Sequence, residues 1–214
     1  MKTGKRAICV GLSLILALSL FGDTEEQKII ERVEKAVRSA STLSIHFTEK
    51  FIWKMTGEEN TLSGTMLMAG EDRFRIETED QILVSDGKTL WTYSKPANRV
   101  LIDKLAQTEE SLLPRQLLLQ YTKGYSAKRL PDETVLGIHC IVLLFTDTEG
   151  TSYYSKWELW VDPDTYLPRQ LMQEDLSGNQ NIYLLESVET GVKIDPDRFR
   201  FKIPEGADVI QMQE

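Results

Sequence analysis

The pattern of apolar and polar residues changes its period near residue 42 of this chain. Between residues 24 and 40 apolar side chains recur every three or four positions, with charged residues between them. Thr24, followed three positions later by Gln27, is typical of a capping box at the start of a helix. This segment is therefore predicted to be one amphipathic helix. From Leu43 to Trp53 apolar residues occupy alternate positions instead, which predicts a long strand.

Further short runs have the composition of β-strands. They cover residues 61–68, 73–78, 81–85, 89–94, 99–103, 134–146, 153–161, 167–175, 179–188 and 200–203. Turn signals separate them, including Asp86-Gly87, whose glycine suits the positive backbone dihedral of a tight hairpin. The order of these runs predicts a meander of antiparallel strands.

Residues 107–121 have a different pattern, with leucines grouped around Pro114, and are predicted to form a helix or two short broken helices. Neither an internal repeat nor a dividing linker is visible, so residues 23–214 are expected to form a single domain. About ten or eleven strands with two helical segments predict a mainly β fold: an unclosed, antiparallel half-barrel with helices on its concave face.

The first residues resemble an export signal. Lys2, Lys5 and Arg6 precede an apolar run over residues 7–21, which has the length of a signal-peptide core. We expect a signal peptide over residues 1–22, cleaved near Gly22, and a periplasmic product; a retained membrane anchor is the alternative. Cleavage would change the formal charge from −8 to −11. Nucleic acid is not expected as a partner, because binding it requires a basic surface.

Residues able to do chemistry are few. The histidines are His46 and His139, and neither a nucleophile elbow nor a metalloprotease motif is present. His139 and Cys140 are adjacent on a predicted strand, so their side chains point to opposite faces, which is wrong for a shared metal. We therefore predict a protein without enzymatic activity, metal or cofactor. Cys140 is expected to be a small core residue.

One segment resembles a known family. Residues 82–93, ILVSDGKTLWTY, are similar to the central strand pair of the LolA-type lipoprotein carriers, and Phe47-Thr48-Glu49-Lys50 and residues 197–209 match other parts of that family. The resemblance covers nearly all of the mature chain. It implies a half-barrel with a helical lid over an apolar cavity, in a monomeric periplasmic protein. Such a carrier receives lipoproteins from an inner-membrane ABC transporter and delivers them to an outer-membrane receptor.

Large apolar side chains are the candidates for acyl-chain contact in such a cavity, although an ordinary packed core explains the same pattern. The candidates are Phe47, Phe51, Trp53, Met66, Met68, Phe74, Ile76, Leu90, Trp91, Leu112, Leu113, Leu117, Trp157 and Leu159. We expect the first helix and the segment from Leu112 to Leu119 to fill the empty cavity and to move aside for cargo.

The sequence departs from the family at one position. Typical members carry Arg-Pro just after the strand that ends here at Met68, and that arginine helps to hold the lid shut; here Gly70-Glu71 follows. Arg73 or Arg75 is the candidate replacement for this latch.

Three other functions are compatible with the pattern. One is a sensor that binds lipids or lipoproteins, as in RseB-like proteins, although those carry a second C-terminal domain. Another is a carrier of a different amphiphile, such as a glycolipid. A lipid esterase is the enzymatic alternative, but it would need a nucleophile and a base that the sequence does not display.

Overall fold

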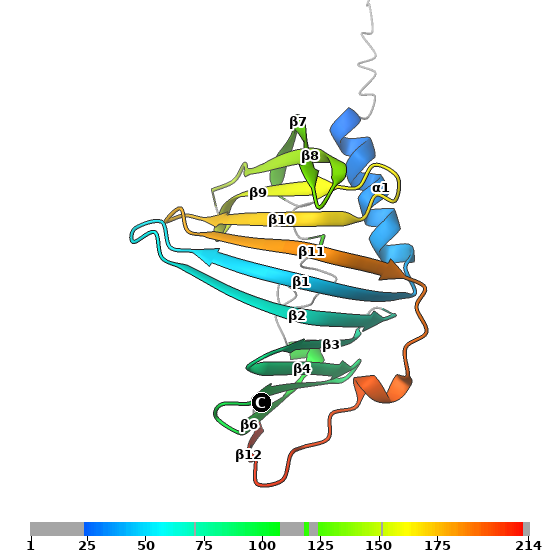
Figure 1. The fold of residues 1–214 in the computed structure, drawn as a ribbon, viewed down its shortest axis with the longest axis vertical. Helices are drawn as coiled ribbons and strands as arrows, with labels where there is room; N and C mark the ends of the chain where they lie inside the picture. Colours follow the sequence, from blue (N-terminus) through cyan, green and yellow to red (C-terminus); the bar gives the residue numbers. More distant parts are fainter. Residues whose placement is uncertain (1–23, 71, 108–117, 120–123, 151, 212–214) are drawn as a thin grey trace, which may run out of the picture.

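A computed structural model describes residues 24–70, 72–107, 118–119, 124–150 and 152–211 of the chain (Figure 1). The elements, in chain order, are α1 (Glu25–Ser39), β1 (Thr42–Ile52), β2 (Glu59–Ala69), β3 (Arg73–Thr78), β4 (Gln81–Asp86), β5 (Thr89–Ser94), β6 (Arg99–Lys104), η1 (Leu105–Gln107), β7 (Tyr125–Val135), β8 (Ile138–Asp147), β9 (Tyr154–Val161), β10 (Pro168–Asp175), β11 (Gln180–Thr190), η4 (Pro196–Phe199) and β12 (Asp208–Gln211).

One sheet contains all twelve of these strands, in the order β12-β6-β5-β4-β3-β2-β1-β11-β10-β9-β8-β7. Neighbouring strands are antiparallel except for β12, which runs parallel to β6. The pairing of β1 with β11 joins the early hairpins to the late ones. The described strands thus form an unclosed, mainly antiparallel sheet, as predicted.

Two predicted strands need correction. Residues 134–146 are not one strand, because Leu136 and Gly137 have positive φ values of 50° and 81° and form the turn between β7 and β8. The prediction of a strand at 200–203 is also wrong. That segment is extended without strand pairing, and the last strand is β12, where Asp208 donates its N–H to the carbonyl of Asn98 at 2.9 Å.

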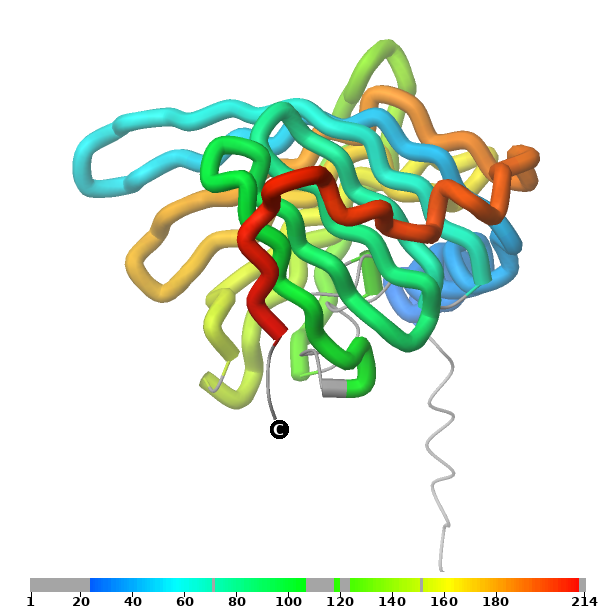
Figure 2. Tube along the Cα trace, turned by 90° about the horizontal axis from the view of Figure 1, so that it is seen from below, coloured from blue at the N-terminus to red at the C-terminus, as the bar shows by residue number. Residues whose placement is uncertain are grey.

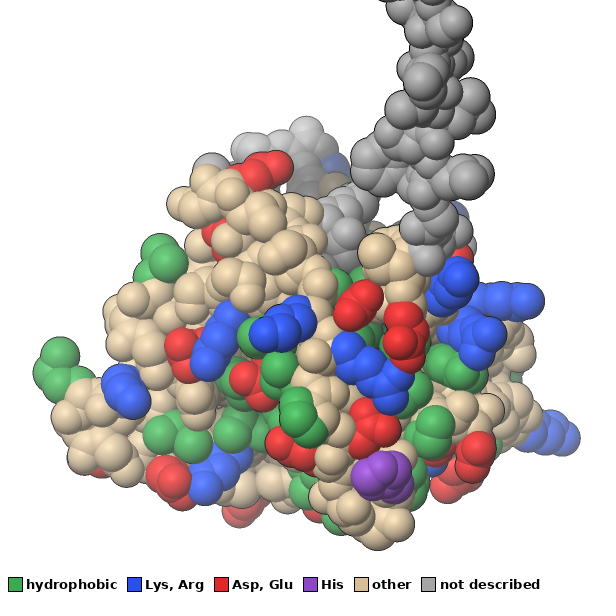
Figure 3. All heavy atoms as spheres, turned by 90° about the horizontal axis from the view of Figure 1, so that it is seen from above, with side chains coloured by type: hydrophobic (Ala, Val, Ile, Leu, Met, Phe, Trp, Pro, Cys, Tyr) green, Lys and Arg blue, Asp and Glu red, His purple; other side chains and the backbone are tan. Residues whose placement is uncertain are grey.

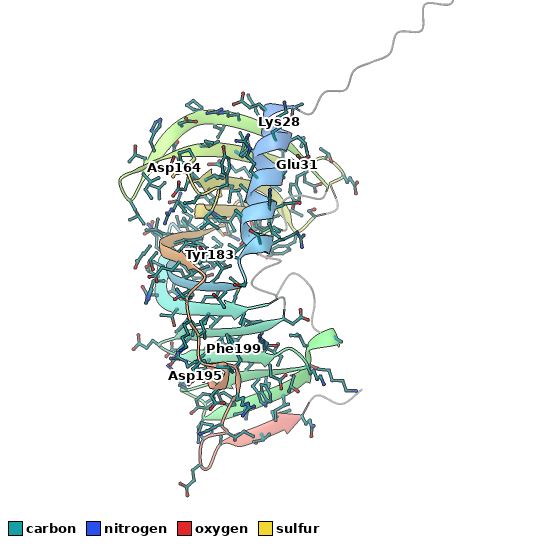
Figure 4. The ribbon with its side chains drawn as sticks, turned by 90° about the vertical axis from the view of Figure 1, so that its right-hand side faces the viewer. Lys28, Glu31, Asp164, Tyr183, Asp195 and Phe199 are labelled. Carbon is teal, nitrogen blue, oxygen red and sulfur yellow. The ribbon has the colours of Figure 1, made fainter. Side chains whose placement is uncertain are left out.

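Helix α1 begins at the predicted cap residue, Thr24, and buries the predicted apolar side chains, but only half of the predicted capping box forms. The hydroxyl of Thr24 accepts a hydrogen bond from the N–H of Gln27 at 3.2 Å, which satisfies one of the free N–H groups of the first turn. The Gln27 side chain reaches Glu31 rather than closing a reciprocal capping box. Ile29, Ile30, Val33 and Val37 are buried, whereas Lys28 and Glu31 project from the helix toward solvent in Figure 4.

The sheet curls so that one face is concave and lies toward α1 (Figure 2). Because successive side chains of a strand point to opposite faces, each strand contributes every second residue to this concave face. The main apolar cluster lies there and combines residues of α1 with Phe47, Phe145 and Trp157 from the sheet.

The outer face carries two smaller apolar contacts. One is a cluster of Val135, Cys140, Val142, Trp160 and Met172 on strands β7–β10. The other forms where η4 packs against β3 and β4, with Phe199 2% exposed. On the face of the molecule seen in Figure 3, acidic and basic side chains lie side by side rather than forming an extended basic region.

Candidate functional site

Most of the candidate residues lie together on the concave face. Phe47, Met66, Met68, Phe74, Trp157 and Leu159 are buried in the main apolar cluster, and Ile76 and Leu90 pack against it. The same cluster contains the four buried side chains of α1. The predicted apolar stripe is therefore a continuous surface from β3 to β9, covered in part by the helix.

Gly64 lets the ring of Phe47 lie directly on the sheet. Phe47 is opposite Gly64 in the ladder between β1 and β2. A Cβ atom at Gly64 would be 2.8 Å from Cζ of Phe47 and 2.8 Å from the carbonyl oxygen of Glu77, both closer than real Cβ contacts allow. Because Gly64 has no side chain, the Phe47 ring can occupy this position on the concave face.

Two further candidates form the rim of this face. Phe51 and Trp53 follow Phe47 at alternate positions, and their rings meet edge to face with centroids 4.5 Å apart. Trp53 is 40% exposed. Aromatic side chains thus extend from the buried cluster to the solvent near the turn that connects β1 and β2.

Trp91 and the two predicted latch arginines lie on the outer face. Trp91 follows Leu90 directly, so it points away from the concave face on which Leu90 packs. Arg73 and Arg75 flank the buried Phe74 in the same way; Arg73 lies over the ring of Phe199 at 5.7 Å, and Arg75 pairs with Glu77 at 2.9 Å. This placement does not support acyl-chain contact by Trp91 or a latch from either arginine to α1.

The candidates Leu112, Leu113 and Leu117 lie outside the described residues. The next two residues of that segment, Leu118 and Leu119, are described and are 6% and 3% exposed. Both belong to the main apolar cluster. The end of the predicted second helical segment thus contacts the concave face.

A polar group within the concave face was not found from the sequence. Glu49, Gln173, Asn181 and Tyr183, here called the acceptor cluster, occupy adjacent ladder positions on β1, β10 and β11: Glu49 is opposite Tyr183, and Gln173 is opposite Asn181. Asn181 Nδ2 donates to Glu49 Oε1 and to the hydroxyl of Tyr183, each at 2.8 Å. Burial, and then the neighbouring Glu49 carboxylate, raise the pKa of Tyr183, so its hydroxyl stays protonated.

Two oxygens of the acceptor cluster have no hydrogen-bond partner among the described residues. They are Oε1 of Gln173, a residue only 2% exposed, and Oδ1 of Asn181. A buried acceptor without a donor costs about 1–3 kcal/mol. No sequence signal distinguishes these residues, because β10 and β11 also carry polar residues at other positions.

A shallow groove of about 380 Å³ lies where α1 leaves the sheet. It is lined by Ala36, Ser39, Ala40, Ser41, Thr165, Leu167, Thr190 and Gly191. The described residues do not show the predicted lid over an apolar cavity, because Leu112, Leu113 and Leu117 of the segment predicted to cover it lie outside them.

The groups that could perform chemistry are dispersed. Within the described parts of the chain, no three His, Cys, Asp or Glu side chains are grouped as metal ligands. His46 is exposed on β1, in the middle of the sheet, whereas His139 lies 3.7 Å from Asp132 of the edge strand β7. Burial raises the pKa of the Cys140 thiol, which disfavours the nucleophilic thiolate. No helix among the described residues has both the length and the apolar composition needed to span a membrane.

The fold and the concave face together define the class of protein: a curved, unclosed and mainly antiparallel sheet that presents an apolar surface beneath one helix. A family model described as "Outer membrane lipoprotein carrier protein LolA" matches residues 38–202. The chain belongs to this family.

Individual relatives agree with the family assignment. An outer-membrane lipoprotein carrier protein of Alkalilimnicola ehrlichii is 28% identical over 97% of this chain and 95% of its own length. Another, from Chromohalobacter salexigens, is 25% identical over 99% of both chains. The crystal structure of an uncharacterized conserved protein from Thermus thermophilus has a TM-score of 0.58 at 15% identity, covering 88% of this chain and all of its own, which indicates a shared fold.

Proposed function

We propose that this protein is a periplasmic carrier that binds the acyl chains of lipoproteins on its concave face and delivers them toward the outer membrane. The observation that carries the proposal is the continuous apolar surface from β3 to β9, in a chain whose relatives are named outer-membrane lipoprotein carriers. The expected activity is binding and release, without catalysis.

Binding would proceed by exchange, because the apolar surface is covered in the empty protein. Ile29, Ile30, Val33 and Val37 of α1 would leave the sheet as acyl methylenes take their places. Each buried aliphatic side chain is worth about 1.5–3 kcal/mol, so the four together contribute about 6–12 kcal/mol. One long acyl chain contributes on the order of 10 kcal/mol, at about 0.8 kcal/mol per methylene. The two quantities nearly cancel, which suits a carrier that must release its cargo.

The segment around Leu118 and Leu119 would act as a second cover, since both leucines pack on the same cluster as α1. An inner-membrane ABC transporter would load the carrier, and an outer-membrane receptor would unload it. Residues 1–22 would be removed as a signal peptide during export. Each transfer requires only that the acceptor bury the acyl chains better than the donor does.

The test is to purify the protein from its native envelope and to identify co-purified lipid-modified polypeptides by mass spectrometry. Phe51→Asp places a charge on the concave rim, and Ile52→Asp places the same charge one residue later, on the outer face. We expect the wild type and Ile52→Asp to retain acylated polypeptides and Phe51→Asp to lose most of them. Recovery of no acylated polypeptide with the wild type, or equal recovery with both variants, would contradict the proposal.

A further inference from the structure

The acceptor cluster is set into the apolar surface rather than at its margin. In the ladder, Gln173 lies between Trp157 and Asn181, and Asn181 is followed by Phe51. Trp157 is fully buried, and Phe51 belongs to the aromatic rim. An acyl chain lying along the concave face from the rim inward would therefore place its linkage to the rest of the cargo beside the cluster.

The geometry determines which atoms of the cluster remain available. A carboxylate can only accept hydrogen bonds, so the contact with Glu49 requires that Nδ2 of Asn181 face it. The carbonyl oxygen of Asn181 is thereby left without a donor, as is Oε1 of the nearby Gln173. The cluster thus offers two buried acceptors and a carboxylate.

The partner that fits this set is a hydrogen-bond donor without negative charge. A free fatty acid or a phosphate would bring further acceptors and a like charge toward Glu49, which is unfavourable in a desolvated site. An ester oxygen also lacks a donor. An amide N–H next to an acyl chain supplies the missing donor, and the backbone of an acylated polypeptide supplies several.

We propose that the acceptor cluster selects cargo whose acyl chain is joined through an amide N–H, with Gln173 and Asn181 as specificity-determining residues. This inference rests on the proposed function, since it concerns the same concave face. It explains why polar side chains interrupt the apolar surface at these positions.

The test uses two probes that differ in one group: N-ethylhexadecanamide and ethyl hexadecanoate. Each competes with a fluorescent acyl probe for the purified protein. Gln173→Met keeps nearly the same side-chain volume and removes the acceptor. Gln170→Met is the matched control, because Gln170 is on the same strand opposite the outer-face residue Trp160.

We expect the wild type and Gln170→Met to bind the amide about five- to tenfold more tightly than the ester, as one satisfied hydrogen bond provides. Gln173→Met should reduce this ratio to about one by weakening amide binding, with little change for the ester. Equal affinities in the wild type, or an unchanged ratio in Gln173→Met, would overturn the inference and leave the carrier function standing. Failure of both probes to bind would overturn the proposed function itself.

Discussion

Replacement of Gly64 by alanine tests the packing of the concave face at one atom. The added Cβ would be 2.8 Å from the carbonyl oxygen of Glu77, 2.8 Å from Phe47 Cζ and 3.0 Å from Phe47 Cε1, whereas ordinary contacts begin at 3.4 Å. Two neighbours must therefore move by about 0.6 Å or more. Overpacking of this kind costs about 1–3 kcal/mol.

The two clashes differ in how they can relax. The Phe47 ring can rotate away, but the Glu77 carbonyl is held in the ladder between β2 and β3. The loss in the free energy of unfolding caused by Gly64→Ala should therefore be about 0.5–1 kcal/mol smaller in a Phe47→Leu background than in the wild type. The remaining loss comes from the clash with the backbone.

The assay is urea unfolding followed by tryptophan fluorescence, because Trp157 is fully buried in the same cluster. Gly64→Ala should lower the free energy of unfolding without changing its dependence on urea. Thr61→Ala, at an exposed position of the same strand, is the control and should change stability by less than about 0.5 kcal/mol. A Gly64→Ala effect as small as that of the control would refute the described packing of Phe47.

Three further predictions concern other parts of the fold. Burial alone would raise the pKa of Asp162, but hydrogen bonds from Arg169 and from backbone N–H groups hold this pKa below its ordinary value of 3.8. The ionised Asp162 therefore stabilises the folded protein above pH 3.8, and this contribution is lost as the pH falls through the lowered pKa. Asp162→Asn should therefore cost about 3 kcal/mol at pH 7 and flatten the acid loss of stability, measured by urea unfolding at several pH values; an unflattened profile would contradict the assignment. Thr24→Ala removes the cap on Gln27 and should cost about 1 kcal/mol, measured in the same way; no loss would mean that the cap is dispensable. Cys140 is fully buried and should react with a thiol reagent only as fast as the protein opens, so fast labelling of the folded protein would contradict its burial.

Strong local patterns predicted much of the fold. The helix, the first six strands and the unclosed sheet followed from the two apolar periods and from turn signals such as Asp86-Gly87. Strand β7 was missed because its proline and charged residues hide the alternation, and because the turn at Leu136-Gly137 interrupts an apolar run. Strand β12 was misplaced because its pairing with β6 depends on contacts between residues far apart in sequence.

The site was predicted less completely, for the same physical reason. Phe47, Trp157 and similar residues were recognisable as large apolar side chains at alternate positions, but the face assigned to Trp91 depended on the phase of one short strand. The acceptor cluster requires knowing that Glu49 lies opposite Tyr183 and that Asn181 lies opposite Gln173. The register between these strands is a property of the folded sheet, and it cannot be predicted from the residue pattern of a short sequence segment.

The measurement that most directly tests the central claim is photocrosslinking to an acylated lipoprotein from the two faces of the sheet. A photoreactive amino acid would replace Phe51 on the concave rim in one variant and Trp91 on the outer face in another. Binding of acyl chains to the concave face predicts adducts on the acyl chains from position 51 and none from position 91. Adducts from position 91 alone, or from both positions equally, would contradict it.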